Sequence, residues 1–325
     1  MTRREGTRVQ AYLIRRLLLM IPVLIGVSLI IFGILRGLPG DAIDAQLTNS
    51  GNLSAADREQ ARKTLGLDKP IWQQYLIWVR DAVRGDFGTS FQSRVSVTAD
   101  LRNRIPVTAE LALLTLVIAV VVGLPIGILA AARPDSAVDY FARSASIAAL
   151  SMPTFWIGIM LLYFCSRWLG YFPPYGQRFN IFTDTSRNLQ SMMLPALTLG
   201  LPFAAVAMRL TRSQMLEVLR QDYIRTAWAK GLRERSVIVR HAMKNAMIPV
   251  VTVLGNQLGF LLGGTIVTEQ LFSLPGVGRL TRDAIFQRDY PVLQASVLFL
   301  AVVFLAINLI VDLLYARLDP RIRYS

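Results

Sequence analysis

Residues 111–132 read LALLTLVIAVVVGLPIGILAAA and contain no charged side chain. At 1.5 Å per residue, a helix of this stretch is about 33 Å long, which is enough to cross the roughly 30 Å hydrocarbon core of a bilayer. Hydrophobic residues make up 53% of the chain and charged residues only 17%. A soluble domain holds about a quarter charged residues, so the composition excludes that class. The sequence predicts an all-α, polytopic membrane protein.

Six apolar runs are long enough to form transmembrane helices. They cover residues 17–35, 111–132, 145–164, 192–208, 247–267 and 292–311. Four of these runs contain proline (Pro22, Pro125, Pro153 and Pro195), which a membrane bundle tolerates because neighbouring helices satisfy the freed backbone groups. The first run is followed by no small-x-small cleavage site, so we expect a retained span and not a secretory signal.

The basic residues indicate which loops face the cytoplasm. With six spans, residues 1–16, 133–143, 209–244 and the tail from Asp312 share one side and carry a net charge of +11, whereas the opposite set carries +3. The positive-inside rule places the first set, and both termini, in the cytoplasm. The resulting organisation is a cytoplasmic N-terminus over residues 1–16, a first span over 17–35, an extracytoplasmic helical segment over 36–105 and a core with the other five spans over 106–325.

The extracytoplasmic segment is patterned as two helices. Ser54 followed by Asp57 is typical of a helix start, and a second helix is expected from Pro70. Its apolar and aromatic residues recur at intervals of three and four, so one face is expected to lie at the membrane interface or pack on the bundle; they are Trp72, Tyr75, Leu76, Val79 and Val83. The segment is interpreted either as a brace over the bundle or as a docking surface.

The loop between the fourth and fifth runs carries the most specific motif. Residues 222–232 read DYIRTAWAKGL, and Arg240-His241-Ala242 and then residues 244–249, KNAMIP, follow. The stretch predicts two short helices broken at Gly231, because glycine tolerates the positive φ of a sharp turn. It resembles the cytoplasmic EAA loop of binding-protein-dependent ABC importer permeases, in the form found in the dipeptide, oligopeptide and nickel branch. Arg225 stands where that motif often has an acid, so the role of the acid is not transferred.

The resemblance extends over nearly the whole chain. It includes residues 151–158 (SMPTFWIG), 172–176 (FPPYG), 210–217 (LTRSQMLE) and 272–279 (FSLPGVGR). It implies a permease of the type I ABC importer kind whose loop over 209–248 couples to ATPase subunits. The residues implied for that coupling are Asp222, Tyr223, Arg225, Thr226, Ala227, Lys230, Gly231, Leu232, His241, Asn245 and Pro249.

The family also implies partners. The chain has no G-x-x-x-x-G-K-[ST] loop, so ATP hydrolysis would belong to two ATP-binding cassette subunits, and this chain is expected to be non-catalytic. One set of six spans implies a second permease subunit, and recognition of the solute implies an extracytoplasmic binding protein. A single histidine and a single cysteine argue against a metal or thiol site, and no cofactor is expected. The net charge of +14 is explained by topology and anionic lipids, so nucleic acid is not expected as a partner.

The translocation path is expected to carry few charges, which favours an importer over an ion-coupled carrier because carriers place ionisable groups near the midplane. Candidate path residues are Asn256, Gln257, Gly259, Gly263, Pro153 and Phe155. The stripe Gly255-Gly259-Gly263 either packs a helix closely or faces this path. The expected cargo is a dipeptide or short oligopeptide in a prokaryotic inner membrane. The alternatives are a nickel chelate, glutathione or another small peptide-like solute, and, from another class, a stand-alone ion-coupled carrier or channel.

Overall fold

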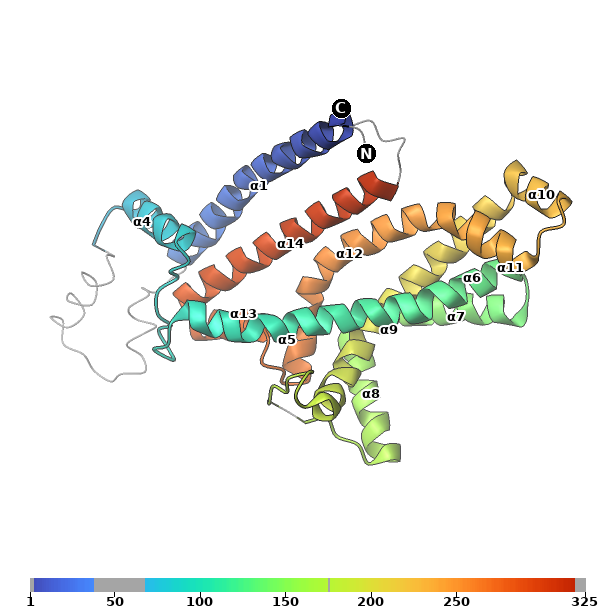
Figure 1. The fold of residues 1–325 in the computed structure, drawn as a ribbon. Helices are drawn as coiled ribbons and strands as arrows, with labels where there is room; N and C mark the ends of the chain where they lie inside the picture. Colours follow the sequence, from blue (N-terminus) through green and yellow to red (C-terminus); the bar gives the residue numbers. More distant parts are fainter. Residues whose placement is uncertain (1–2, 38–67, 175, 319–325) are drawn as a thin grey trace. The chain divides into compact units, whose positions relative to one another are not determined.

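The structure is a computed structural model that describes residues 3–37, 68–174 and 176–318. Within these ranges the regular elements are helices, and a single antiparallel bridge joins Thr89 to Ser96 (Figure 1). In chain order they are α1 (Arg3–Gly37), α4 (Ile71–Val83), α5 (Val97–Ile118), η1 (Ala119–Gly123), α6 (Leu124–Ala132), α7 (Ala137–Ser151), α8 (Thr154–Leu169), α9 (Thr185–Leu219), α10 (Asp222–Ala229), α11 (Glu234–Ser236), η2 (Val237–Ala242), α12 (Met243–Leu271), α13 (Val277–Gln287) and α14 (Tyr290–Leu318). The helix expected from Ser54 lies outside the described residues.

The expected spans are matched by five helices and one bent pair of helices in the described part of the chain. The five are Ile14–Gly37, Val97–Ala132, Thr185–Leu219, Glu234–Gly259 and Tyr290–Leu314, each long and apolar enough to cross a membrane. The sixth, expected as one run over 145–164, consists of α7 and α8, which meet at an angle of 107°. The third expected span is therefore a bent pair of helices in the structure.

Pro153 lies at this bend and favours a break between the two helices. A proline disfavours helical geometry for the residue before it, and Met152 is extended with φ −93° and ψ 134°. Pro153 then begins α8, where its missing N–H costs nothing. Pro125 perturbs its helix less, because the π-helical turn η1 directly precedes it and the chain continues into α6.

The second of the two short helices expected around Gly231 does not end as a separate element. α11, η2 and α12 follow one another without a break from Glu234 onward. No glycine or proline occurs between residues 234 and 248, so nothing in the sequence terminates the helix before it enters the fifth span. The prediction of a separate second helix was wrong. Of the two expected short helices, only α10 is a separate element.

The contacts divide the chain into two compact units. One unit contains residues up to 106 and residues 275–305, and the other contains residues 107–274 and residues from 306 onward. α5 and α14 each contribute residues to both units.

In the unit built from residues 107–274, α9 is the central helix. It contacts α6, α7, α8 and α12, and most of its middle section is buried. Glycines permit close approaches to the backbone of α9: a Cβ on Gly123 would lie 2.6 Å from the carbonyl oxygen of Ala204, and one on Gly127 would lie 2.6 Å from that of Met208. Small residues at such positions let membrane helices pack backbone against backbone.

In the other unit, α4 packs on α1 as its aromatic pattern predicted. The hydroxyl groups of Tyr75 and Ser28 are 2.8 Å apart, and the rings of Tyr75 and Phe32 meet edge to face at 5.4 Å. Trp72 and Leu76, which belong to the same apolar pattern, are exposed. Exposed Trp and Leu beside a packed helix face fit an interfacial helix, because tryptophan favours the membrane–water boundary.

Candidate functional site

Helix α10 is a short helix fixed to the bundle by its apolar face. Ile224 is fully buried and Ala227 is 6% exposed. They join a cluster whose other buried members are Ala131 of α6, Met215 of α9, Val237 and Ala242 of η2, and Ala246 of α12. Four elements of the unit therefore hold α10 in place, although it has only two turns and would not be stable alone.

The opposite face of α10 is polar and exposed. Asp222 lies in the first turn, where an acid complements the helix dipole, and its carboxylate is 3.3 Å from the guanidinium of Arg225. Thr226 donates to the carbonyl of Asp222 at 3.0 Å. Tyr223 and Trp228 are each exposed by more than two fifths. The exposed surface of α10 thus combines aromatic and charged groups.

The end of α10 is a glycine-terminated turn. Gly231 has φ +74°, its N–H donates to the carbonyl of Trp228 at 2.9 Å, and the N–H of Leu232 donates to that of Ala227 at 3.4 Å. These two bonds form a Schellman motif, which requires a left-handed residue and so favours glycine. The positive φ expected at Gly231 is confirmed.

A side-chain bond ties α10 to the start of α12. The amide of Asn245 donates to the hydroxyl of Tyr223 at 2.8 Å, and this hydroxyl lies 3.5 Å from the backbone carbonyl of His241. Residues separated by some twenty positions in the sequence are thereby brought together at one point. This contact and the buried cluster both connect α10 to the helix that continues into the fifth span.

The structure brings most of the sequence-predicted coupling residues to this point. Asp222, Tyr223, Arg225 and Thr226 lie on α10, and Lys230, Gly231 and Leu232 form its terminal turn, whereas Ala227 faces the core. His241 is half-buried in η2, and Pro249 lies a turn beyond Asn245 inside α12.

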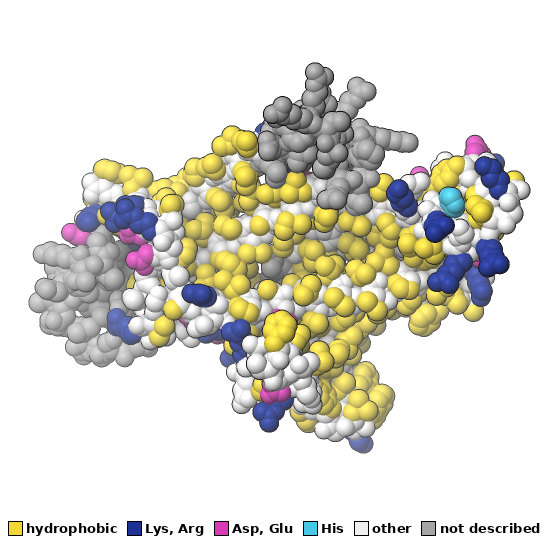
Figure 2. All heavy atoms as spheres, in the orientation of Figure 1, with side chains coloured by type: hydrophobic (Ala, Val, Ile, Leu, Met, Phe, Trp, Pro, Cys, Tyr) yellow, Lys and Arg dark blue, Asp and Glu magenta, His cyan; other side chains and the backbone are white. Residues whose placement is uncertain are grey.

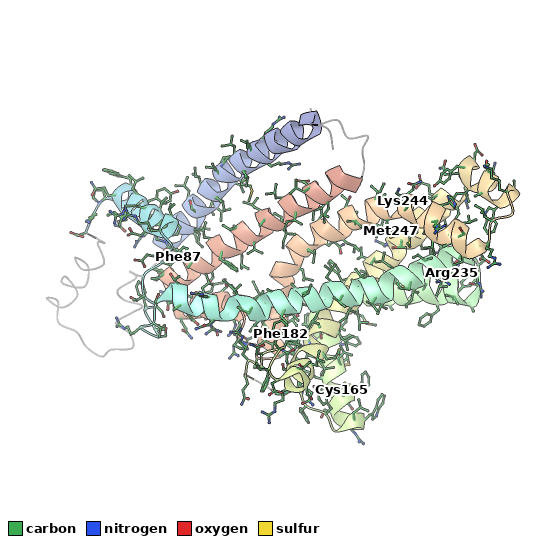
Figure 3. The ribbon with its side chains drawn as sticks, viewed as in Figure 1. Phe87, Cys165, Phe182, Arg235, Lys244 and Met247 are labelled. Atoms are coloured by element: carbon green, nitrogen blue, oxygen red, sulfur yellow. The ribbon has the colours of Figure 1, made fainter. Side chains whose placement is uncertain are left out.

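Basic side chains surround this end of the unit. Figure 2 shows Lys and Arg side chains and the histidine gathered around α10 and α11, while hydrophobic side chains cover the long helices. Arg235 and Lys244 lie at this end, and Phe182 and Cys165 lie on the side of the unit away from α10 (Figure 3).

The candidate path residues are dispersed. Asn256 and Gly263 are exposed on α12, Gln257 is half-buried and Gly259 is buried. Gly255 serves packing, because a Cβ there would lie 2.3 Å from Cγ2 of Val311 in α14, whereas a Cβ on Gly263 would meet nothing within 4 Å. Pro153 and Phe155 are exposed at the α7–α8 bend. These residues do not form one lined site within this chain.

An apolar groove of about 450 Å³ lies in the same unit, between α12, the end of α14 and the α5–α6 helix. Its walls include Gly255 but none of the candidate path residues. Within the described ranges, no group of three or more His, Cys, Asp or Glu side chains is placed to hold a metal ion.

Sequence reasoning missed two polar anchors. Asp139 of α7, bonded to Arg212 of α9, was not singled out, although Ser136 three residues earlier completes a capping pattern that could have pointed to it. Asp289, at the α13–α14 corner, is 3% exposed and accepts bonds from the Ser90 hydroxyl and from the N–H of Phe91 at 3.2 Å. No local pattern signals the second anchor, because its partners lie about two hundred residues away.

The long apolar helices define a multi-pass membrane protein. Two family profiles match the chain: "Binding-protein-dependent transport system inner membrane component" over residues 123–324, and the N-terminal component of the same systems over residues 9–112. The chain belongs to this family of binding-protein-dependent transport system inner-membrane components. It is a permease subunit in an inner membrane.

Curated relatives match along almost the entire chain. The oligopeptide transport system permease protein AppB of Bacillus subtilis (strain 168) is 42% identical, with 97% of this chain and 99% of the relative covered. The dipeptide transport system permease protein DppB and the glutathione transport system permease protein GsiC, both of Escherichia coli (strain K12), have the same identity and coverage.

Solved structures support the fold. An amino acid ABC transporter with histidines matches with a TM-score of 0.52 at 16% identity, over 68% of this chain and 94% of that one. The inward-facing MetNI methionine ABC transporter matches with a TM-score of 0.54 at 15% identity, over 68% of this chain and 96% of that one. The fold is therefore that of ABC importer permeases.

Proposed function

We propose that this chain is the permease subunit of an ATP-driven importer for dipeptides or short oligopeptides. It forms half of the translocation pathway and couples to ATPase subunits through residues 222–249. The observation that carries the proposal is the short helix α10. It is packed on the unit by the buried residues Ile224 and Ala227, and it exposes Tyr223, Arg225 and Trp228. A surface of this kind, at the basic end of the unit, suits a cytoplasmic partner.

The energy source is assigned to partner chains. The sequence has no phosphate-binding loop, so two ATP-binding cassette subunits supply hydrolysis. A second permease subunit completes the path, and an extracytoplasmic binding protein delivers the solute. In this proposal both termini and α10 face the cytoplasm, as the charge distribution favours.

The cargo has one specific rival. The glutathione permease of Escherichia coli is as similar to this chain, at 42% identity, as the dipeptide permease is. Glutathione is itself a tripeptide-like solute, so the same scaffold serves either cargo. We favour dipeptides and oligopeptides because the relatives of both bacteria include permeases with those names.

Reconstitution of the complex tests the proposal. Vesicles that contain this chain, the second permease, both ATPases and the binding protein are expected to take up a labelled dipeptide in the presence of ATP. Vesicles that contain this chain alone are expected to show no uptake under ATP or under a proton gradient, because the chain has neither a phosphate loop nor a pair of midplane carboxylates. Unlabelled glutathione in excess, as competitor, distinguishes the two cargoes. Gradient-driven uptake by the single chain would replace the importer with a carrier.

A further inference from the structure

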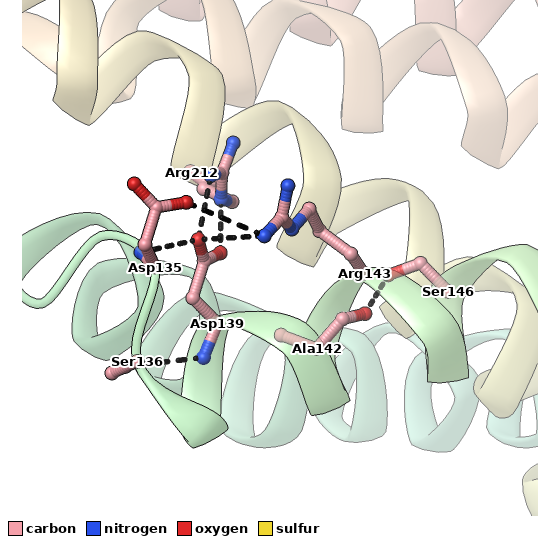
Figure 4. Close-up of polar contacts among 7 residues, drawn as sticks. All are labelled: Asp135, Ser136, Asp139, Ala142, Arg143, Ser146 and Arg212. Atoms are coloured by element: carbon pink, nitrogen blue, oxygen red, sulfur yellow. Dashed lines mark hydrogen bonds and ion pairs between the residues drawn. The ribbon is translucent and has the colours of Figure 1, made fainter.

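A buried ion pair joins α7 to α9; neither of its residues is among those named individually for coupling, although Arg212 lies at the start of the 209–248 loop. Asp139 is fully buried, and Arg212 is 21% exposed. Nη2 of Arg212 donates to Oδ2 of Asp139 at 2.8 Å, and Nε of Arg212 donates to the other carboxylate oxygen (Figure 4). The contact is therefore bidentate, the strongest and most directional form of ion pair.

Further groups complete the cluster around Asp139. The backbone N–H of Asp135 donates to its Oδ2 at 3.1 Å, and Nη2 of Arg143 lies 3.5 Å from the same oxygen. The N–H of Asp139 itself donates to the Ser136 hydroxyl, which caps α7, at 3.3 Å. The turn between α6 and α7 is thus hydrogen-bonded to the same carboxylate that pairs with Arg212 of α9.

The pair lies close to the base of α10. Arg212 precedes Met215 by one helical turn, and Met215 is fully buried in the cluster that holds Ile224 and Ala227. The same cluster includes Ala131, in the last turn of α6 before the α6–α7 turn. The Asp139–Arg212 pair therefore joins two of the segments on which α10 rests.

A buried ion pair resists sliding between two helices more strongly than apolar packing does. Apolar contacts between α7 and α9 tolerate a small slide, but separating a buried carboxylate from its guanidinium leaves an uncompensated charge. The pair holds α7, the α6–α7 turn and the end of α9 in one register, so force on α10 moves them together.

We propose that Asp139 and Arg212 are positioning residues for energy coupling: their ion pair makes the base of α10 rigid, so that ATPase movements reach the spans. The inference rests on the proposed function, and it assigns no contact with ATPase or solute to either residue. The exposed pair Asp184–Arg187, at 3.7 Å and at the other end of α9, provides a matched control.

The test uses the assembled complex with Asp139→Asn, Arg212→Lys, or the charge swap Asp139→Arg with Arg212→Asp. Arg187→Gln is the control, since it breaks an exposed pair on the same helix. Two quantities are measured: the amount of complete complex, and the ratio of substrate-stimulated to basal ATP hydrolysis per complex. Each single variant is expected to lower the ratio about fivefold, the lower range of allosteric coupling. The swap is expected to recover at least half of the loss, and the control to keep the wild-type ratio.

The outcomes separate positioning from bulk stability. A wild-type ratio in assembled Asp139→Asn and Arg212→Lys complexes would overturn the inference. So would single variants that fail to assemble and are not restored by the swap, because the pair would then serve only folding. Restoration of both assembly and ratio by the swap supports it. If the wild-type complex itself shows no ATP-dependent uptake of a dipeptide, the proposed function fails first, and that result is distinct from a variant effect.

Discussion

Replacing Gly231 by Trp is expected to abolish substrate-stimulated ATP hydrolysis in the assembled importer, while the chain still inserts in the membrane. Gly231 has φ +74°, and a β-carbon in this left-handed conformation costs about 1–2 kcal/mol. Apart from Gly231 and the two residues next to it, no heavy atom lies within 4 Å of the position that a Cβ would take. The first atom of the side chain is therefore accommodated by the chain itself, and we expect the large indole to obstruct a partner docked on the turn after α10.

Gly170 supplies the matched control for this prediction. It caps α8 with φ +61°, and a Cβ there would also meet nothing within 4 Å. Gly170→Trp carries the same backbone cost but lies away from α10, so it is expected to keep stimulated hydrolysis within about twofold of wild type. Gly231→Asn is expected to be intermediate or mild, since asparagine tolerates the left-handed region. Normal stimulation in a Gly231→Trp complex would show that this turn is not a docking site.

Replacing Asp289 by Ala is expected to release the loop over residues 85–96. The carboxylate accepts from the Ser90 hydroxyl and from the N–H groups of Phe91 and Gln92 at 3.2 and 3.3 Å. Loss of a buried charged acceptor leaves these donors unpaired and costs about 3 kcal/mol, which raises the open population of the loop ~100-fold. Tryptic cleavage after the exposed Arg94, followed by mass spectrometry on detergent-purified protein, measures that opening.

Asp283→Ala is the control for loop release. Asp283 is partly exposed on α13 and pairs with Arg282 at 3.0 Å, and such pairs contribute at most about 1 kcal/mol. Cleavage after Arg94 is expected to stay within a few-fold of wild type. Equal cleavage rates in wild type and Asp289→Ala would mean that the carboxylate does not anchor the loop.

The sequence was informative where one physical requirement dominates. Bilayer thickness alone predicts the long apolar helices, and the positive φ at Gly231 follows from a glycine that ends a short polar helix. The packing of α4 by Tyr75 followed from aromatic spacing.

The sequence was less informative where two requirements compete. Pro153 lies in a run apolar enough to span, and a membrane helix accommodates some prolines, as Pro22 and Pro195 remain inside α1 and α9. The 107° bend at Pro153 depends on how α7 and α8 pack on α9, and a linear pattern does not encode that packing.

Long-range pairs escaped prediction for a related reason. Asp139 and Arg212 are separated by 73 positions, and each has the appearance of an ordinary charge at the end of an apolar run. Their burial becomes visible only when α7 lies against α9. The candidate coupling residues were easier to find, since they are contiguous in the sequence around α10.

Site-specific photocrosslinking tests the central claim most directly. A photoreactive benzoylphenylalanine is placed at Trp228, which is 45% exposed on α10, or at Phe182, which is 91% exposed on the side of the unit away from α10. In membranes that contain the whole importer, the probe at Trp228 is expected to crosslink to an ATP-binding subunit, and the probe at Phe182 is not. Crosslinks to that subunit from Phe182, with none from Trp228, would contradict both the proposed orientation and the assignment of α10 to coupling.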